Sequence, residues 1–256
     1  MDFAQFRERV YITFKLNLNA YKESQLKRRL DALMAKKQYR PGDYEGFLKV
    51  LMKDKQEYTD FIDTVTINVS EFFRDKEIFD TLETKVFPMM VSKGALKIWS
   101  AACSIGCEAY SMAMILNELT NNRMHSIEAT DIDKNILSSA AAGVYKKDHV
   151  RNVKKDRLVK YFKQNGDSYV LADSIKRMVK FRQHDLLTGA YGQNYDLIVC
   201  RNVMIYFTKE IQDMLNKKFI KALKPGGVFF IGASEMIFNH KELGLEKIAS
   251  CYYLRK

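Results

Sequence analysis

Polar side chains that could bind a ligand follow several short apolar runs of the chain. Asp131, Asp185 and Asn202 each come directly after a run that is typical of a buried strand. Because open α/β sheets bind ligands at the carboxyl ends of their parallel strands, we expect these side chains at one sheet edge. Asp131 follows Gly106 by about 25 residues, near the interval at which a carboxylate accepts hydrogen bonds from ribose hydroxyls. The spacing therefore predicts a nucleoside site.

The segment 96–111, LKIWSAACSIGCEAYS, predicts a strand, a turn of small residues and the start of a helix. Such a turn lets backbone N–H groups approach a ligand, although it also fits ordinary strand-to-helix packing. Its only glycine is Gly106, so the G-x-G-x-x-G pattern of dinucleotide sites is absent. Together with the acids after the next two strands, this turn favours an adenosine ligand without a pyrophosphate, namely S-adenosylmethionine. Asp133, two residues after Asp131, can cap the helix that follows, and the two roles do not compete.

The element order predicts a doubly wound, Rossmann-like parallel sheet. The run 195–200, YDLIVC, is a continuous apolar strand, and a helix over 209–223 and a strand over 228–232 follow it. A last, antiparallel strand is expected at 251–254. The basic stretch at about 146–178, with a hairpin near its middle, interrupts the α/β alternation and predicts a small β-subdomain.

Residues 1–63 show helical periodicity and no strand pattern, so they predict a small all-α domain in which Asp43 caps the third helix. The β-branched run 64–67 disfavours helix, and a capped helix is expected near Ser70. We therefore expect a linker over 64–75 that contributes to a cleft, and a second domain over 76–256.

Composition narrows the class of protein. The chain has 256 residues, 47% of them hydrophobic, and a net charge of +11. Residues 146–182 hold 12 basic and 4 acidic side chains, which suits nucleic acid, an anionic membrane or an acidic protein surface. The N-terminus has no signal-peptide pattern and no run of about 18 apolar residues occurs, so we expect a cytoplasmic protein without membrane insertion. Four scattered cysteines predict neither disulfides nor a metal site.

Five stretches together resemble one known family. They are TINVSEFFRD (66–75), WSAACSIGCEAYS (99–111), ATDID (129–133), CRNVMIYF (200–207) and LKPGGVFFIGASE (223–235). Along essentially its whole length the chain is similar to CheR, the family of chemotaxis receptor glutamate methyltransferases. The resemblance implies a helical N-terminal domain followed by a methyltransferase domain with a small β-subdomain.

The resemblance also implies the site residues. The expected contacts to S-adenosylmethionine, which leaves as S-adenosylhomocysteine, are Asn68, Ser70, Arg74, Glu108, Asp131, Asp185, Leu186, Arg201 and Asn202. Arg74 and Tyr206 match the residues thought to position the substrate glutamate. The first turn departs from the commoner family form, which has an acidic residue at the position of Cys107 and a proline at that of Ala109. Since Glu108 is retained, we expect cofactor binding to survive.

The implied chemistry fits these residue types. A glutamate is ionised near neutral pH, since its unperturbed pKa is about 4.3, so no general base is needed. Proximity and alignment then supply the rate, with Arg74 orienting the carboxylate and the Tyr206 hydroxyl setting the attack angle. The resemblance implies membrane-bound chemoreceptors as partners, so we expect a cytoplasmic enzyme recruited to receptor arrays. We also expect it to act as a monomer, with no nucleic acid partner.

Two other functions would suit parts of the sequence. An RNA methyltransferase would suit the basic segment, but residues 202–206 read NVMIY and lack the N/D-P-P-Y arrangement used on exocyclic amines. A non-catalytic receptor-binding module would be favoured by loss of Arg74, Asp131 or Tyr206, and all three are present. For a receptor substrate, Arg28, Arg29 and the lysines of 146–163 are expected to bind its acidic surface.

Overall fold

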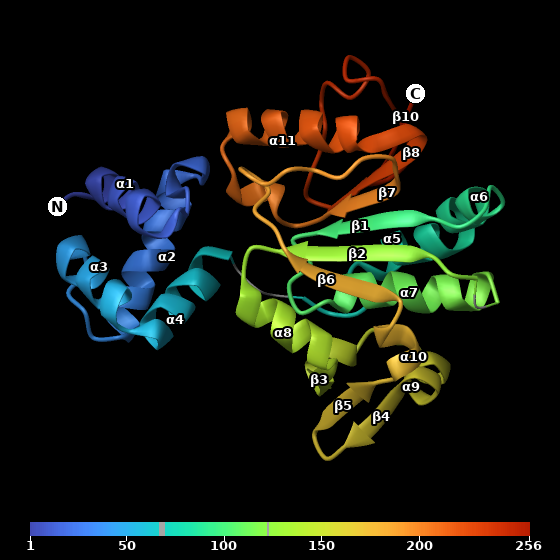
Figure 1. Cartoon of the computed structure of the whole chain (residues 1–256), viewed down its shortest axis with the longest axis horizontal. Coiled ribbons are helices and arrows are strands. Elements are labelled where there is room, and N and C mark those ends of the chain that lie inside the picture. Colours follow the sequence, from blue (N-terminus) through green and yellow to red (C-terminus); the bar gives the residue numbers. More distant parts are fainter. Residues whose placement is uncertain (67–69, 122) are drawn as a thin grey trace. The chain divides into compact units, whose positions relative to one another are not determined.

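The computed structural model describes residues 1–66, 70–121 and 123–256, and the chain forms two compact units (Figure 1). The first unit comprises Met1–Asn68 and Tyr206–Asp213, and the second comprises Val69–Ile205 and Met214–Lys256. None of the helices among these described residues has the length and apolar character needed to cross a membrane.

The first unit is helical, as the periodicity predicted. Its elements are α1 (Phe3–Phe14), η1 (Leu18–Ala20), α2 (Glu23–Lys36), α3 (Tyr44–Lys53) and α4 (Lys55–Thr66). The rings of Phe6, Phe47 and Phe61 meet in its core, with Phe61 edge-on to the other two. Asp43 caps α3 by accepting a hydrogen bond from the backbone N–H of Gly46, as expected.

The expected domain boundary at residue 63 falls inside α4, so the prediction of a non-helical run from residue 64 was wrong as far as Thr66. Val65 is fully buried, and the guanidinium of Arg29 donates to the carbonyls of Thr64 and Val65, 3.1 Å from each. Burial and an arginine bound to the last carbonyls outweigh the low helix propensity of β-branched residues.

The second unit is built on a seven-stranded sheet in the order β6-β2-β1-β7-β8-β10-β9. The strands are β1 (Lys97–Ala101), β2 (Ser126–Asp131), β6 (Val179–Gln183), β7 (Tyr195–Cys200), β8 (Leu223–Ile231), β9 (Leu245–Ala249) and β10 (Tyr252–Arg255). The first five in spatial order pair in parallel, and β10 is antiparallel to β8 and β9. The predicted doubly wound fold with an antiparallel last strand is confirmed.

Helices cover both faces of this sheet (Figure 1). They include α7 (Cys107–Leu119), α8 (Lys134–Ala142) and α11 (Lys209–Ala222). Successive residues of a strand point to opposite faces. On β1, Trp99 packs against Phe219 of α11, whereas the hydroxyl of the next residue, Ser100, bonds to Glu108 of α7. Asp133 caps α8 by accepting from the N–H of Asn135.

The basic insertion forms a subdomain of its own. Its strands β3 (Val144–Lys146), β4 (Phe162–Asn165) and β5 (Ser168–Leu171) make an antiparallel sheet in the order β3-β5-β4, drawn in green and yellow in Figure 1. Its helical elements are η3 (Lys147–Val150), α9 (Lys155–Tyr161) and α10 (Asp173–Lys176). The β-structure thus begins two residues before the expected start at residue 146.

The segment before the sheet differs from the prediction of a helix near Ser70. The next helical elements are α5 (Lys76–Thr81), η2 (Leu82–Val86) and α6 (Phe87–Val91). Between them and Ser70 the backbone is irregular, and Phe73 and Asp75 adopt left-handed φ values of 52° and 59°. This path turns a short polar segment toward the carboxyl edge of the sheet.

Candidate active site

The turn after β1 has an unusual backbone. Ala102, Ser104 and Gly106 have φ values of 57°, 50° and 81°, all in the left-handed region. A side chain at Gly106 would place its Cβ 3.0 Å from the ring of Phe181, so this position also needs a small residue for packing. Strained non-glycine residues gather at functional sites, and the turn leads directly into the N-terminus of α7.

Asp131 holds this turn against the end of β2. The side chain of Asp131 is buried, and its two carboxylate oxygens accept hydrogen bonds from the backbone N–H groups of Ser104 (2.9 Å) and Asp133 (3.1 Å). Burial raises the pKa of this carboxyl, while the two N–H groups act in the opposite direction. Since each oxygen has a second lone pair, Asp131 can still accept bonds from vicinal hydroxyls.

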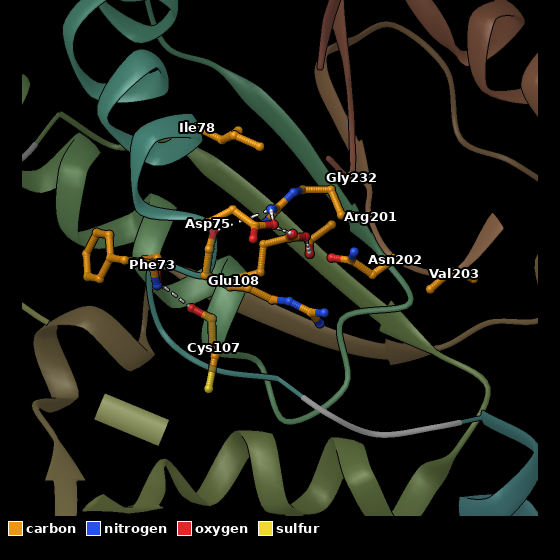
Figure 2. Close-up of polar contacts among 12 residues, drawn as sticks. Phe73, Asp75, Ile78, Cys107, Glu108, Arg201, Asn202, Val203 and Gly232 are labelled. Atoms are coloured by element: carbon orange, nitrogen blue, oxygen red, sulfur yellow. Dashed lines mark hydrogen bonds and ion pairs between the residues drawn. The ribbon is translucent and has the colours of Figure 1, made fainter. Parts of the chain in front are cut away.

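Arg201 joins the end of β7 to two other segments of the edge (Figure 2). Its side chain is 2% exposed and donates to Glu108 at 3.3 Å and to Asp75 at 2.7 Å. The guanidinium also lies 5.4 Å and 4.8 Å from the ring centroids of Phe79 and Phe230. Arg201 therefore places the two carboxylates, and its expected contact with S-adenosylmethionine stays a prediction.

Glu108 opens α7 and points toward β1. One carboxylate oxygen accepts the hydroxyl of Ser100 at 2.9 Å, and the other faces Arg201. Burial raises the pKa of Glu108, and Arg201 opposes that shift. Cys107 beside it is buried as well, and burial raises the pKa of its thiol against a hydrogen bond with Ser70. Cys107, one of the two residues that depart from the commoner family form, is thus a buried, neutral thiol.

The two residues before Arg74 fix the segment that carries it. Phe72 packs edge-on against Tyr145 and Phe162 of the β-subdomain. The N–H of Phe73 donates to the hydroxyl of Ser111, 3.0 Å away. The backbone of Arg74 is therefore fixed, and its side chain is partly exposed.

Asp185 and Leu186 follow β6, next to the end of β2. The carboxylate of Asp185 accepts from the N–H of Leu187 at 2.8 Å and from the hydroxyl of Thr188 at 2.7 Å, and Leu186 is buried. Asp131 pairs in register with Gln183, so the acids after the second and third strands share one edge, as expected.

Tyr206 belongs to the helical unit. Its carbonyl accepts the N–H of Lys22 at 2.9 Å, and its ring lies 5.2 Å from the guanidinium of Arg29. Arg29 is thus engaged inside its own unit, whereas Arg28 is exposed, so of this pair Arg28 fits the expected docking role better.

Most predicted residues of the second unit lie in segments that meet at the carboxyl edge of the parallel sheet. Asn68 lies outside the described residues, and Tyr206 is part of the other unit. Sequence reasoning missed Asp75, the partner of Arg201, and Glu235, whose carboxylate binds the backbone after β7. Both residues belong to stretches that resemble the family, but their spacing from other residues in the sequence did not indicate a role for either.

The residues present fit an adenosine ligand. The Ser104 hydroxyl is buried, with no hydrogen-bond partner in the part of the chain that the structure describes. It stands in the turn that Asp131 holds, so a polar ligand group there would gain both a donor and an acceptor. Asp131 would hold ribose hydroxyls, and the left-handed Asn202 adds a backbone carbonyl and a side-chain amide at the end of β7.

Comparison with known proteins agrees with this geometry. Residues 1–66 match the model described as "CheR methyltransferase, all-alpha domain", and residues 68–252 match "CheR methyltransferase, SAM binding domain".

Curated relatives extend the match along the chain. A chemotaxis protein methyltransferase of Listeria monocytogenes is 40% identical over 256 residues, which cover 99% of this chain and 97% of that protein. Its namesake in Borreliella burgdorferi is 34% identical and covers 91% and 87%. Chemotaxis protein methyltransferase 2 of Pseudomonas aeruginosa is 32% identical and covers 94% and 89%. These matches cover both the helical domain and the doubly wound sheet. The chain therefore belongs to the CheR family of S-adenosylmethionine-dependent methyltransferases of chemotaxis.

Proposed function

We propose that this chain methylates glutamate side chains on the cytoplasmic helical region of chemoreceptors, giving glutamate methyl esters for sensory adaptation. Bound S-adenosylmethionine supplies a methyl group on a positively charged sulfur. One carboxylate oxygen forms a bond to the methyl carbon as the carbon–sulfur bond breaks, and the electron pair of that bond stays on sulfur. The products are the methyl ester and S-adenosylhomocysteine, and no proton has to move.

One observation carries the proposal. A chain that matches a methyltransferase family over both of its domains retains Arg74 and Tyr206 in the stretches that resemble the substrate-positioning motifs of that family. Because the nucleophile is already ionised, this reaction needs orientation and exclusion of water more than acid–base chemistry.

Arg74 is suited to orient an anion. Its backbone is held by the anchors of Phe72 and Phe73, and its guanidinium donates in a planar fork that matches a carboxylate. Arg74 orients the substrate carboxylate rather than pairing with it tightly, since a carboxylate bound too strongly would be a weaker nucleophile. Tyr206 sets the angle of attack through its hydroxyl, and the guanidinium of Arg29 over its ring restrains that ring within the helical unit.

The basic surface provides the docking contacts in this proposal. The lysines of 146–163 are all exposed on the β-subdomain, namely Lys146, Lys147, Lys154, Lys155, Lys160 and Lys163. The receptor region that the family methylates is rich in glutamate, so it would be attracted to such a surface in a salt-dependent way. We propose that the enzyme is cytoplasmic, is recruited to receptor arrays through these contacts, acts as a monomer, and needs neither a metal nor nucleic acid.

The decisive experiment is transfer of a labelled methyl group from S-adenosylmethionine to chemoreceptor-containing membranes, followed by mild alkali. Label on the receptor that alkali releases as methanol establishes a carboxyl ester. Label that is stable to alkali, or that appears on RNA added in parallel, contradicts the proposal and leaves the family assignment standing.

Variants then test the two roles. Arg74→Ala and Tyr206→Phe should each lower kcat for receptor methylation while the protein stays folded, and Tyr206→Phe should keep its affinity for S-adenosylhomocysteine. Lys247→Ala, which removes an exposed lysine of β9, is the control and should keep normal turnover. Normal turnover in both test variants would show that the roles are assigned to the wrong residues.

A further inference from the structure

Glu235 has no part in the function proposed so far, yet its contacts are unusual. It ends the stretch LKPGGVFFIGASE, three residues after Gly232, in the loop that follows β8. Its side chain is partly buried and faces the backbone that follows β7.

The carboxylate of Glu235 accepts four backbone hydrogen bonds. One oxygen, Oε1, accepts the N–H groups of Val203 at 3.1 Å and Met204 at 2.9 Å. The other, Oε2, accepts those of Asn202 at 3.1 Å and Gly232 at 2.7 Å. Each oxygen has two lone pairs in the carboxylate plane, so all four acceptor sites are used.

The backbone is shaped for this anion. Asn202 has a left-handed φ of 59°, which lets three successive N–H groups converge on one point. Such a concave arrangement of N–H groups binds anions. Here the anion is a side chain of the same chain, brought from the neighbouring strand β8.

Gly232 closes the arrangement from the other side. A Cβ added at Gly232 would lie 2.8 Å from Oε2 of Glu235 and 2.9 Å from the N atom of Asn202. Figure 2 draws Gly232, Asn202 and Val203 near Arg201, at the ends of β7 and β8. A side chain larger than hydrogen would therefore force these groups apart.

We propose that Glu235 is a positioning residue for methyl transfer. Its ionised carboxylate sets the backbone of residues 202–204, and through it the side chain of Asn202 and the start of the segment that leads to Tyr206. The proposal rests on the proposed roles of Asn202 and Tyr206, and adds a residue that contacts neither cofactor nor substrate. Backbone N–H groups bound to a charged acceptor give the loop one fixed conformation before the cofactor binds.

Glu235→Gln is the sharpest test, because it keeps the size of the side chain. Its amide nitrogen would face two backbone N–H donors where the parent has an acceptor, so the loop must shift. We expect affinity for S-adenosylhomocysteine, measured by calorimetry, to fall at least about tenfold, with a parallel loss of kcat. Glu242→Gln, in the exposed part of the same loop, is the matched control and should bind like the parent.

Glu235→Ala allows a second readout that a general loss of packing would not give. The variant keeps all four N–H donors and lacks the anion, so formate from solution should occupy the vacated position. We expect formate, compared with chloride at equal ionic strength, to restore part of the lost affinity in Glu235→Ala and to have no such effect on the parent or on Glu235→Gln. Gly232→Ala should weaken binding without any response to formate.

The outcomes are separable. If Glu235→Gln and Glu235→Ala lower only the thermal midpoint, and bind S-adenosylhomocysteine within twofold of the parent, the positioning role is refuted. Absence of formate rescue together with weak binding would also refute it, because the charge would then not be the active feature. Calorimetry requires no methyl acceptor, so failure of receptor methylation in the parent would overturn the proposed function alone.

Discussion

Replacing Arg157 by methionine should lower the free energy of unfolding more than the loss of any other single charge in the β-subdomain. Arg157 lies on α9, and its side chain is 4% exposed. It makes bidentate contacts to Glu83 of η2, at 2.7 and 3.0 Å, and to Glu118 of α7, with a shortest distance of 2.6 Å. Its guanidinium also lies 5.1 Å from the ring centroid of Phe73, beside Arg74.

The size of the effect follows from burial. Removing one partner of a buried ion pair costs about 3–5 kcal/mol, because the remaining charge is left without compensation. The two carboxylates are 23% and 27% exposed, so water screens them in part and we expect the lower end, about 3 kcal/mol. Arg151 offers a matched control, since it also binds a glutamate outside the β-subdomain, Glu71, but its side chain is 66% exposed. Its loss should change stability little.

Urea unfolding of Arg157→Met, Arg151→Met and the parent measures the difference. The triple variant Arg157→Met, Glu83→Gln, Glu118→Gln should recover part of the loss, because no buried charge is then left alone. Since Phe73 lies under Arg157, the single variant should also lower kcat for methyl transfer. Equal free energies of unfolding for Arg157→Met and Arg151→Met would refute the reasoning that burial decides the contribution of these two arginines.

Three further outcomes are expected. Because burial raises the pKa of Glu108, its carboxyl group holds a proton more tightly in the folded protein than in the unfolded chain, and the contribution of Glu108 to stability falls as the pH rises from about 4 through the folded pKa. Urea titrations should therefore show Glu108→Gln gaining stability relative to the parent over that pH interval. A difference in free energy of unfolding that is constant with pH would contradict this. Gly106→Ala forces a left-handed alanine against Phe181, and should cost roughly 1–2 kcal/mol or more and weaken S-adenosylhomocysteine binding in calorimetry; unchanged binding would exclude the turn from the site. Arg28→Glu should weaken receptor binding most at low salt, and binding that is equal to the parent at every salt concentration would remove Arg28 from the docking surface.

Sequence patterns predicted the central strands β1, β7 and β8 because each contains a buried apolar run. The segment Tyr195–Cys200 is buried at every position, and the single-glycine turn and Asp131 lie where a βα unit requires them. These features are local, so they can be seen in the chain alone. The alternation of strands with helices predicts parallel pairing, as seen for β6, β2, β1, β7 and β8, but not their spatial order.

The segment 70–75 was mispredicted because distant residues decide its path. Its polar start and the following charges suggest a capped helix. In the structure Phe72 is buried between rings of the β-subdomain, and the left-handed Phe73 donates its N–H to Ser111. α5 therefore begins only at Lys76. Tertiary contacts outweighed a weak local propensity.

Charged residues whose partners are far away in the sequence could not be identified from sequence patterns either. Glu235 binds N–H groups 31 to 33 residues away, and Arg201 joins Asp75 across 126 residues. No spacing rule links such pairs, and only the fold shows that the ends of β7 and β8 are neighbours. The resemblance covered these stretches without giving the individual carboxylates a role.

A common arrangement unites the carboxylates at this edge. Asp131 is held by two backbone N–H groups, Glu235 by four, and Glu108 by Ser100 and the buried Arg201. Fixed donors rather than mobile lysines hold each charge, so the acceptors are in place before a ligand arrives and little reorganisation is needed on binding. The exposed lysines of the subdomain do not take part in holding these carboxylates. The fold thus separates the charges that shape the site from the exposed lysines that we propose as the docking surface.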